Sequence, residues 1–229
     1  MTILETEISS RSFILTSRGE HRILIIEHSV LNFQKEVSQM PKDKTGNHIK
    51  IIEAAKREFT TYGFADASMR RIAADCGMSA SGLYKHFESK EEMFATLVDP
   101  VLEGFKDLYR KAGQEGKSDT KAVMQYIYDH IDEFKLIVSH SRGTRYENYL
   151  HDIALLEEKS SLAYLQSLKS KGTRVREVDP KEFHLLVTIN VNAIFQAVEH
   201  DLTREEAMNY ANTLETFFLY SWRKVFGLP

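Results

Sequence analysis

The sequence contains few of the residues that cross-link or interrupt a chain. Its 229 residues include one cysteine, Cys76, which excludes an intramolecular disulfide, and no Cys/His pair has zinc-site spacing. There are only four prolines and 11 glycines, and the glycines fall mostly between stretches with helical periodicity. No apolar run exceeds four residues, whereas a membrane-spanning helix needs about 20. These absences favour a cytoplasmic protein without a membrane span.

Signals for strands and for common catalytic motifs are also missing. There is no Asn-Gly or Asp-Gly hairpin turn, no GxSxG, no HExxH, no phosphate-binding GxxxxGK(S/T) loop and no Rossmann glycine fingerprint. The composition, 42% hydrophobic and 28% charged, is ordinary for a folded globular chain. We therefore expect an all-α protein that is not an enzyme and that needs no cofactor.

Residues 1–45 are the hardest part of the chain to interpret. Their apolar residues could form a short helix or strand, but no clear caps flank them. Met40 stands directly before Pro41 and the first strong helical pattern. One hypothesis is that translation starts at Met40, which would leave the upstream stretch outside the fold.

Residues 47–94 contain four helical patterns separated by glycine and serine. In the first, residues 47–62, apolar side chains recur at spacings of three and four, and Gly63 ends it. The third, residues 80–86, is shorter than two turns. Each of the last three follows a serine predicted to cap it, and Glu92 completes a capping box on the last; these serines are Ser68, Ser79 and Ser89.

The second and third patterns, joined at Gly77, match a helix-turn-helix, whose second helix enters the major groove of DNA. Leu83 and Phe87 would anchor this short helix and leave small and polar residues facing outward. Small residues allow close approach to base edges, whereas aromatic hydroxyls, cations and helix starts suit phosphates. The predicted DNA-binding residues are Ser68, Arg70, Ser79, Ala80, Ser81, Gly82, Tyr84, Lys85, His86 and Lys90.

Charge alone does not support DNA binding. The net charge is −3, and residues 47–94 contain seven Lys and Arg against seven Asp and Glu. Each candidate taken singly also fits a structural role, since Tyr84 could pack in a core and Lys85 could be an ordinary solvated charge. The prediction therefore rests on the ordered combination of helices, glycines, caps and the aromatic-basic end.

The stretch "IIEAAKREFTTYGFADASMRRIAADCGMSASGLYKHFESKEEMFATLV" resembles the DNA-binding region of TetR-family transcriptional regulators. The resemblance covers about 50 residues and includes Ile-Ala at 72–73, Gly-Met-Ser at 77–79 and Leu-Tyr-x-x-Phe at 83–87. It implies a homodimer that binds a pseudo-palindromic double-stranded DNA operator, more often as a repressor. It also implies release of DNA when a small-molecule effector binds the larger C-terminal domain.

On this basis we expect three parts: an N-terminal extension, 1–45; a helix-turn-helix domain, 46–90; and a helical ligand-binding and dimerisation domain, 91–229. The last should begin with an amphipathic helix kinked at Pro100. Helical blocks follow at 118–140, 146–171, 181–200 and 203–226, the last opened by a capping box of Thr203 and Glu206.

The block 203–226 carries more apolar residues than one helix face needs. Ala207, Tyr210, Ala211, Leu214, Phe217, Phe218 and Val225 form one stripe, which Leu219, Trp222 and Phe226 widen. A second subunit packing on 181–200 and 203–226 would cover this surface, and two-fold symmetry would match a palindromic operator. The alternative is a helix buried wholly within one chain.

The C-terminal helices also carry polar and aromatic groups that could line an effector pocket. Asn190 is predicted to be buried, and a buried amide needs a partner. The candidate ligand-binding residues are Tyr126, His130, Tyr146, Tyr149, Tyr164, His184 and Asn190. Each alone fits an ordinary helical core, and a solid core would favour a DNA-binding organiser without small-molecule input.

A metal site is the other alternative considered for these helices. His130 and Glu133 lie one turn apart and could contribute ligands. Charged amphipathic helices produce such pairs by chance, so a solvated face explains this one better. No metal is expected.

Overall fold

The structure, a computed structural model, describes residues 42–115 and 119–228, and all regular elements in them are helices. The all-α prediction is confirmed. The interpretation of the N-terminal extension, including a start at Met40, concerns residues almost all outside those described. The helices are α2 (Lys42–Asp66), α3 (Met69–Asp75), α4 (Ala80–Leu83), α5 (Lys90–Glu115), α6 (Thr120–Asp129), α7 (Ile131–His140), α8 (Tyr149–Ser170), α9 (Pro180–Glu199) and α10 (Arg204–Phe226).

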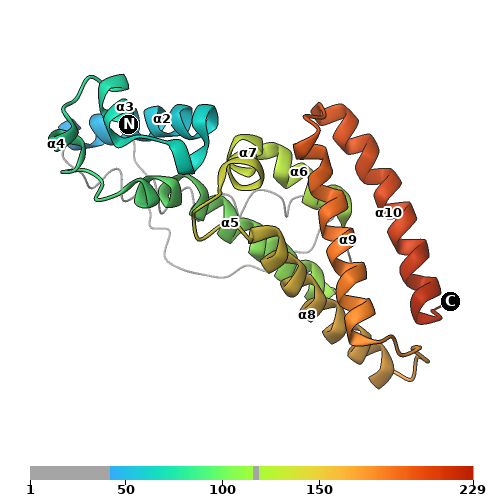
Figure 1. Cartoon of the computed structure of the whole chain (residues 1–229). Coiled ribbons are helices and arrows are strands. Elements are labelled where there is room, and N and C mark those ends of the chain that lie inside the picture. Colours follow the sequence, from blue (N-terminus) through green and yellow to red (C-terminus); the bar gives the residue numbers. More distant parts are fainter. Residues whose placement is uncertain (1–41, 116–118, 229) are drawn as a thin grey trace, which may run out of the picture.

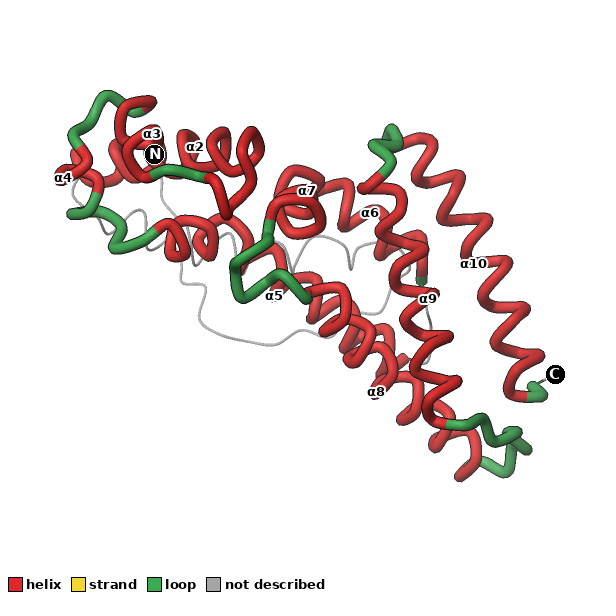
Figure 2. The backbone as a smooth tube through the Cα atoms, viewed as in Figure 1, coloured by secondary structure: helices red, strands yellow, loops and turns green. Residues whose placement is uncertain are grey.

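The helices form an elongated body with the helix-turn-helix at one end (Figure 1). Helices α2, α3 and α4 gather at that end, and α5 runs from them into the middle of the molecule. Helix α8 packs along α5 and α9, while α7 contacts α2 (Figure 2). Helices α9 and α10 form the opposite end. Helix α5 is therefore the continuous connection between the two parts.

Two interruptions shape this path. At Gly63, φ is 72° and ψ is 162°, so α2 breaks where the sequence predicted its end. The predicted block 118–140 was wrong as a single helix, because it divides at His130 (φ −130°, ψ 37°) into α6 and α7. Apolar periodicity continues on both sides of His130, which hid the break. Helix α5, in contrast, continues through Pro100.

The core contains two clusters of aromatic rings that are built on α5. In the first, the Phe94 ring lies 5.2 Å from Phe59, 5.5 Å from Phe64 and 5.7 Å from Tyr146. In the second, Phe105 lies 5.0 Å from Phe134 and 6.0 Å from Phe195. The first cluster joins the helix-turn-helix end to the loop before α8, and the second fills the interior of the C-terminal helices.

The predicted capping box on the last helix is confirmed. Thr203 Oγ1 accepts from the Glu206 amide, and the Glu206 carboxylate accepts from the Thr203 amide at 2.8 Å. This reciprocal pair satisfies two amides that the helix itself leaves without partners.

Gly104 permits a close contact between α5 and α6. The Tyr126 hydroxyl donates to the Val101 carbonyl at 2.9 Å, and a Cβ on Gly104 would clash with Tyr126 Oη. We expect Gly104→Ala to lower the free energy of unfolding by about 1–3 kcal/mol through overpacking. Gly46→Ala is the control, because a Cβ there meets nothing within 4 Å. Urea denaturation of both variants tests this, and equal stability would contradict the steric argument.

Candidate functional site

Helices α3 and α4 form the predicted helix-turn-helix. Gly77 adopts a positive φ of 71°, and the next amide, of Met78, donates to the Ala73 carbonyl at 2.8 Å. Ile72 and Leu83 are fully buried at the crossing of the two helices. A left-handed residue at this position lets the chain turn sharply after α3, so α4 lies across it with its polar side outward.

The exposed side of α4 is small and polar. Ser79 Oγ accepts from the Gly82 amide at 3.1 Å, which confirms the predicted cap, and lies 3.2 Å from Ser81 Oγ. Ser81 is exposed, whereas Ala80 and Gly82 are half-buried. Lys85 is exposed just beyond the helix. The side chains on this surface are thus small enough to allow close approach of a base edge.

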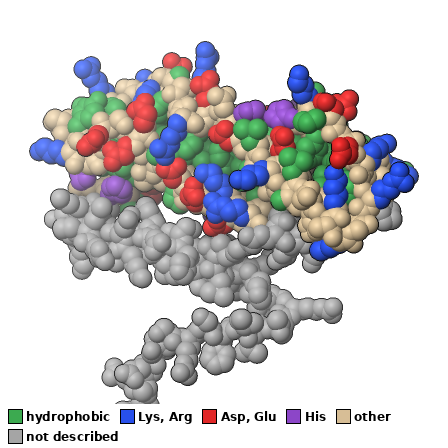
Figure 3. All heavy atoms as spheres, turned by 90° about the horizontal axis from the view of Figure 1, so that it is seen from below, with side chains coloured by type: hydrophobic (Ala, Val, Ile, Leu, Met, Phe, Trp, Pro, Cys, Tyr) green, Lys and Arg blue, Asp and Glu red, His purple; other side chains and the backbone are tan. Residues whose placement is uncertain are grey.

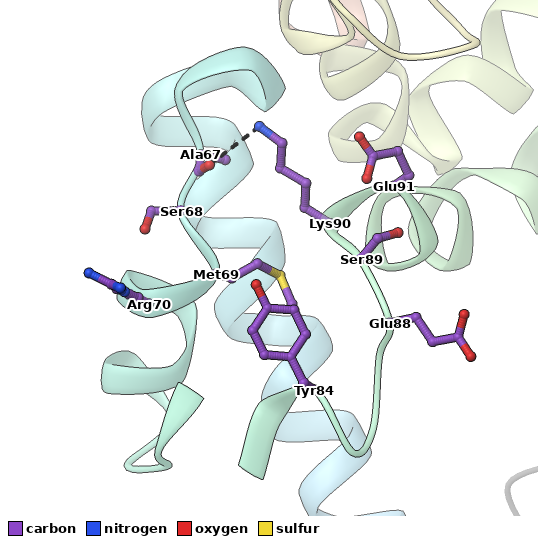
Figure 4. Close-up of a pocket in the computed structure, with 9 residues that line it drawn as sticks. All are labelled: Ala67, Ser68, Met69, Arg70, Tyr84, Glu88, Ser89, Lys90 and Glu91. Atoms are coloured by element: carbon purple, nitrogen blue, oxygen red, sulfur yellow. Dashed lines mark hydrogen bonds between the residues drawn. The ribbon is translucent and has the colours of Figure 1, made fainter. Parts of the chain in front are cut away.

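A surface groove of about 430 Å³ separates the start of α3 from the start of α5 (Figure 4). Ser68 and Arg70 lie on one wall, Ser89 and Lys90 on the other, and the Tyr84 ring lies between them. Tyr84 is 53% exposed. The structure therefore brings four predicted DNA-binding residues to one groove, with Ser89 beside them.

Two local predictions in this groove need correction. The Ser68 side chain makes no capping bond; instead Glu58 Oε1 accepts from the Ser68 amide at 2.8 Å. Ser89 Oγ does accept from the Glu92 amide, but the Glu92 carboxylate accepts from Glu88, one residue before the expected partner. The amides of Ser68 and Glu88, near the starts of α3 and α5, thus already donate to carboxylates at 2.8 and 2.6 Å.

Lys90 supports the fold in this structure. Its ammonium donates to the carbonyls of Phe64, Ala65 and Ala67 at 2.8, 3.0 and 3.4 Å. The same ammonium lies 4.5 Å from the centroid of the Phe64 ring. Lys90 therefore ties the start of α5 to the end of α2, and its contact with a phosphate stays a prediction.

Charge is mixed on the described surface. On the face drawn in Figure 3, basic side chains are interspersed with acidic ones and form no continuous stripe. Glu88 and Glu91 line the α3–α5 groove together with Arg70 and Lys90. On this face, attraction to phosphate would therefore come from individual side chains and not from a continuous basic patch.

The seven predicted ligand-binding residues do not share one pocket. Tyr126 and His130 pack on each other, with ring centroids 4.7 Å apart. His184 Nδ1 lies 2.8 Å from Glu158, and Tyr164 is partly exposed on α8. Asn190 is only half-buried, so its predicted burial was wrong; α9 turns that side toward the surface.

Tyr146 and Tyr149, in contrast, line one groove of about 400 Å³ between α5 and the start of α8. The other lining residues are Asp99, Leu102, Glu103, Lys106, Arg145 and Asp152. We call this the α5–α8 groove. Sequence reasoning missed its charged members because α5 and α8 meet only in the folded chain.

Three groups at the rim of the α5–α8 groove form a closed network. The Tyr146 hydroxyl donates to Asp99 Oδ1 at 2.5 Å, and Arg145 Nη2 donates to Asp99 Oδ2 and to Tyr146 Oη, each at 2.6 Å. Burial and the bond to Asp99 raise the pKa of Tyr146, so its hydroxyl stays protonated as a donor.

A second link joins α2 to α7. Lys56 Nζ lies 2.9 Å from Asp132 and 3.0 Å from Glu133. Burial lowers the pKa of Lys56, but the bonds to both carboxylates outweigh it and the net pKa is raised. Glu133 is thus engaged by a lysine. Within the described ranges, no three His, Cys, Asp or Glu side chains are grouped to hold a metal.

The last two helices expose large apolar side chains. Phe217 was predicted on the buried stripe of α10, but it is 61% exposed, while Ala207, Ala211 and Leu214 face the core. The apolar residues extend around more of the circumference of α10 than one neighbouring helix can cover. The exposed apolar residues on α9 and α10 are Leu185, Ile189, Phe217, Leu219 and Tyr220.

The helix-turn-helix segment also matches a known family. Residues 51–97 match the family model described as "Bacterial regulatory proteins, tetR family". This chain contains the DNA-binding domain of the TetR family. The family comprises transcriptional regulators and not enzymes, so the expectation that the chain is not an enzyme is confirmed.

Curated relatives agree with this assignment. The HTH-type transcriptional repressor KstR2 of Rhodococcus jostii is 28% identical over 131 residues, covering 54% of this chain and 60% of that protein. The uncharacterized HTH-type transcriptional regulator YfiR of Bacillus subtilis is 32% identical over 99 residues, covering 43% and 44%. The chain thus spans less than two thirds of these relatives.

Solved structures show the same fold over a larger share of this chain. "Probable transcriptional regulatory protein RHA5900" aligns with a TM-score of 0.50 and 19% identity, covering 73% of this chain and 95% of that one. A SmeT–triclosan complex aligns with a TM-score of 0.50 and 20% identity, covering 75% and 90%. Among the helices described, none is long and apolar enough to cross a membrane.

Glu58 provides a test of the local architecture. Its carboxylate is 8% exposed and accepts from both the Ser68 amide and Arg71 Nε at 2.8 Å. We expect Glu58→Gln to lower the free energy of unfolding by about 1–3 kcal/mol, because a charged acceptor is lost at a buried site. Glu53→Gln, an exposed position on the same helix, is the control in urea denaturation. Equal midpoints would show that Glu58 does not hold α3.

Proposed function

We propose that this protein is a cytoplasmic transcriptional repressor that binds a pseudo-palindromic operator as a homodimer and releases it when a small molecule binds. The observation that carries the DNA-binding part is the α3–α4 unit, whose exposed side is small and polar and borders the α3–α5 groove. In this arrangement α4 enters the major groove, while Tyr84 and Lys85 contact the flanking phosphates.

The dimer is supported by the uncovered apolar side chains of α9 and α10. Large exposed apolar surfaces usually mark interaction sites, and a C₂ interface uses the same patch on both subunits. Two copies joined through α9 and α10 would present two α4 helices to successive half-sites. The repressor KstR2, which matches part of this chain, is consistent with the sign of regulation.

Effector response is supported by the α5–α8 groove. It lies beside Tyr146, which packs on Phe94 of the cluster that holds the helix-turn-helix end. A ligand that moved α5 would change the spacing of the recognition helices. The SmeT–triclosan complex shows that a chain of this fold can carry a small molecule. An organiser without ligand input would not need this groove.

Selection from a random DNA pool tests the proposed function. The full-length protein, incubated with the pool at several salt concentrations, should enrich a two-fold symmetric site whose affinity falls as salt rises. A folded, dimeric protein that enriches no site, even after refolding from denaturant to remove any bound ligand, would contradict the proposal.

Two variants test the assigned phosphate contacts. Tyr84→Phe and Lys85→Ala should weaken the selected site and a random duplex by the same factor, and Lys85→Ala should reduce the salt slope by about 1. Lys159→Ala, an exposed lysine on α8, is the control. Titrations monitored by fluorescence anisotropy measure both quantities. A loss limited to one operator base pair would contradict a phosphate contact.

A paired substitution tests the dimer. Ile189→Asp with Phe217→Asp places charges on the exposed apolar surface of α9 and α10 and should convert the dimer to a monomer. Because one module contacts only half the site, operator affinity should fall by more than about 100-fold. Leu162→Asp, equally apolar and exposed on α8, should remain dimeric in analytical ultracentrifugation. A double variant that stays dimeric would place the interface elsewhere.

A further inference from the structure

The α5–α8 groove contains a buried hydroxyl without a partner. Tyr149 lines the groove and is 4% exposed, and its Oη has no hydrogen-bond partner among the described residues. Buried polar groups are nearly always bonded, and leaving one unbonded costs free energy. A bound molecule that displaced the side chains covering the Tyr149 hydroxyl would supply the missing bond.

Among the charged residues that line this groove, one carboxylate has no ion-pair partner. Arg145 is paired with Asp99 at 2.6 Å, and Lys106 with Glu103 at 2.8 Å. Asp152, exposed in the first turn of α8, has no ion pair among the described residues. The groove therefore offers a ligand a carboxylate, while both of its cations are already neutralised.

Burial and the charges of the two carboxylates act on Tyr149 in the same direction. Burial, then Tyr126, Glu103 and Asp152, raise the pKa of Tyr149. Glu103 and Asp152 are therefore both close enough to Tyr149 to act on it electrostatically. The hydroxyl remains a neutral phenol that can donate to a ligand or accept from one.

We infer that the α5–α8 groove is an effector site for a small organic cation, whose ammonium binds Asp152 and which hydrogen-bonds the Tyr149 hydroxyl. A groove of about 400 Å³ is within the range for drug-sized ligands. Leu102 and the rings of Tyr146 and Tyr149 provide apolar contact for the body of such a molecule. An organic anion would instead face an unpaired carboxylate.

The site also has a path to the DNA-binding end. Tyr146 lines the groove, bonds Asp99 on α5 and packs 5.7 Å from Phe94, whose ring contacts Phe59 and Phe64. A ligand body that packs on the Tyr146 ring shifts this ring and loosens its contact with Phe94. The effect on DNA rests on the proposed function, whereas ligand binding is measured without DNA. The proposed ligand site and the proposed DNA-binding function can therefore be disproved separately.

The test uses three probes of matched shape on the full-length protein. Isothermal titration compares 4-phenylbutylamine, the neutral 4-phenylbutanol and the anion 4-phenylbutyrate, followed by the amine with each variant. The amine should bind about tenfold more tightly than the alcohol, because its bond to a carboxylate is charge-assisted. The acid should bind least. No amine binding at millimolar concentration, or equal binding of all three, would overturn the inference.

Four variants locate the binding. Asp152→Asn should weaken amine binding about tenfold and leave alcohol binding unchanged. Glu205→Gln is its control, an exposed carboxylate in the first turn of α10. Tyr149→Phe should weaken both ligands without lowering the melting temperature, since it removes an unbonded hydroxyl. Tyr164→Phe, on the same helix but outside the groove, should change nothing. Unaltered amine affinity in Asp152→Asn or Tyr149→Phe would overturn the assignment.

Discussion

The packing of Phe94 is the interaction on which the arrangement of this molecule most depends. Its ring lies between Phe59 and Phe64, which close the core of the helix-turn-helix end, and Tyr146, in the loop before α8. Aromatic rings at 5 to 6 Å bury large areas and tolerate little displacement. A movement of α5 at this point must therefore shift one end of the molecule relative to the other.

The two ends use this connection differently. The helix-turn-helix end is held by contacts within itself, because Glu58 bonds the Ser68 amide before α3 and Lys90 bonds the Phe64 carbonyl near the end of α2. The C-terminal body keeps a polar groove beside α5, where charges are paired at the rim and one tyrosine hydroxyl is left without a partner. A well-bonded DNA-binding end, connected to a groove that still has an unbonded polar group, is the arrangement that a ligand-responsive regulator needs.

Sequence alone predicted the features that depend on local chemistry. Gly77, Ser79 and the Thr203–Glu206 capping box each act within a few residues, so their positions were predicted correctly. Features set by distant packing were missed. The partner of the Ser68 amide is Glu58, ten residues earlier, and the α5–α8 groove depends on where the loop before α8 crosses α5. Apolar periodicity contains neither fact, and it also hid the break at His130.

Hydrogen exchange of the full-length protein, with and without Tyr146→Ala, tests most directly whether the aromatic connection couples the two ends. Mass spectrometry would follow peptides from α2 and from the loop at residues 141–148, with circular dichroism confirming that the variant keeps its helices. If Phe94 couples the two ends, loss of the Tyr146 ring should lower protection from hydrogen exchange in both regions, including residues 51–62 of α2. Faster exchange confined to residues 141–150 would show that the DNA-binding end is held independently, and would contradict the account.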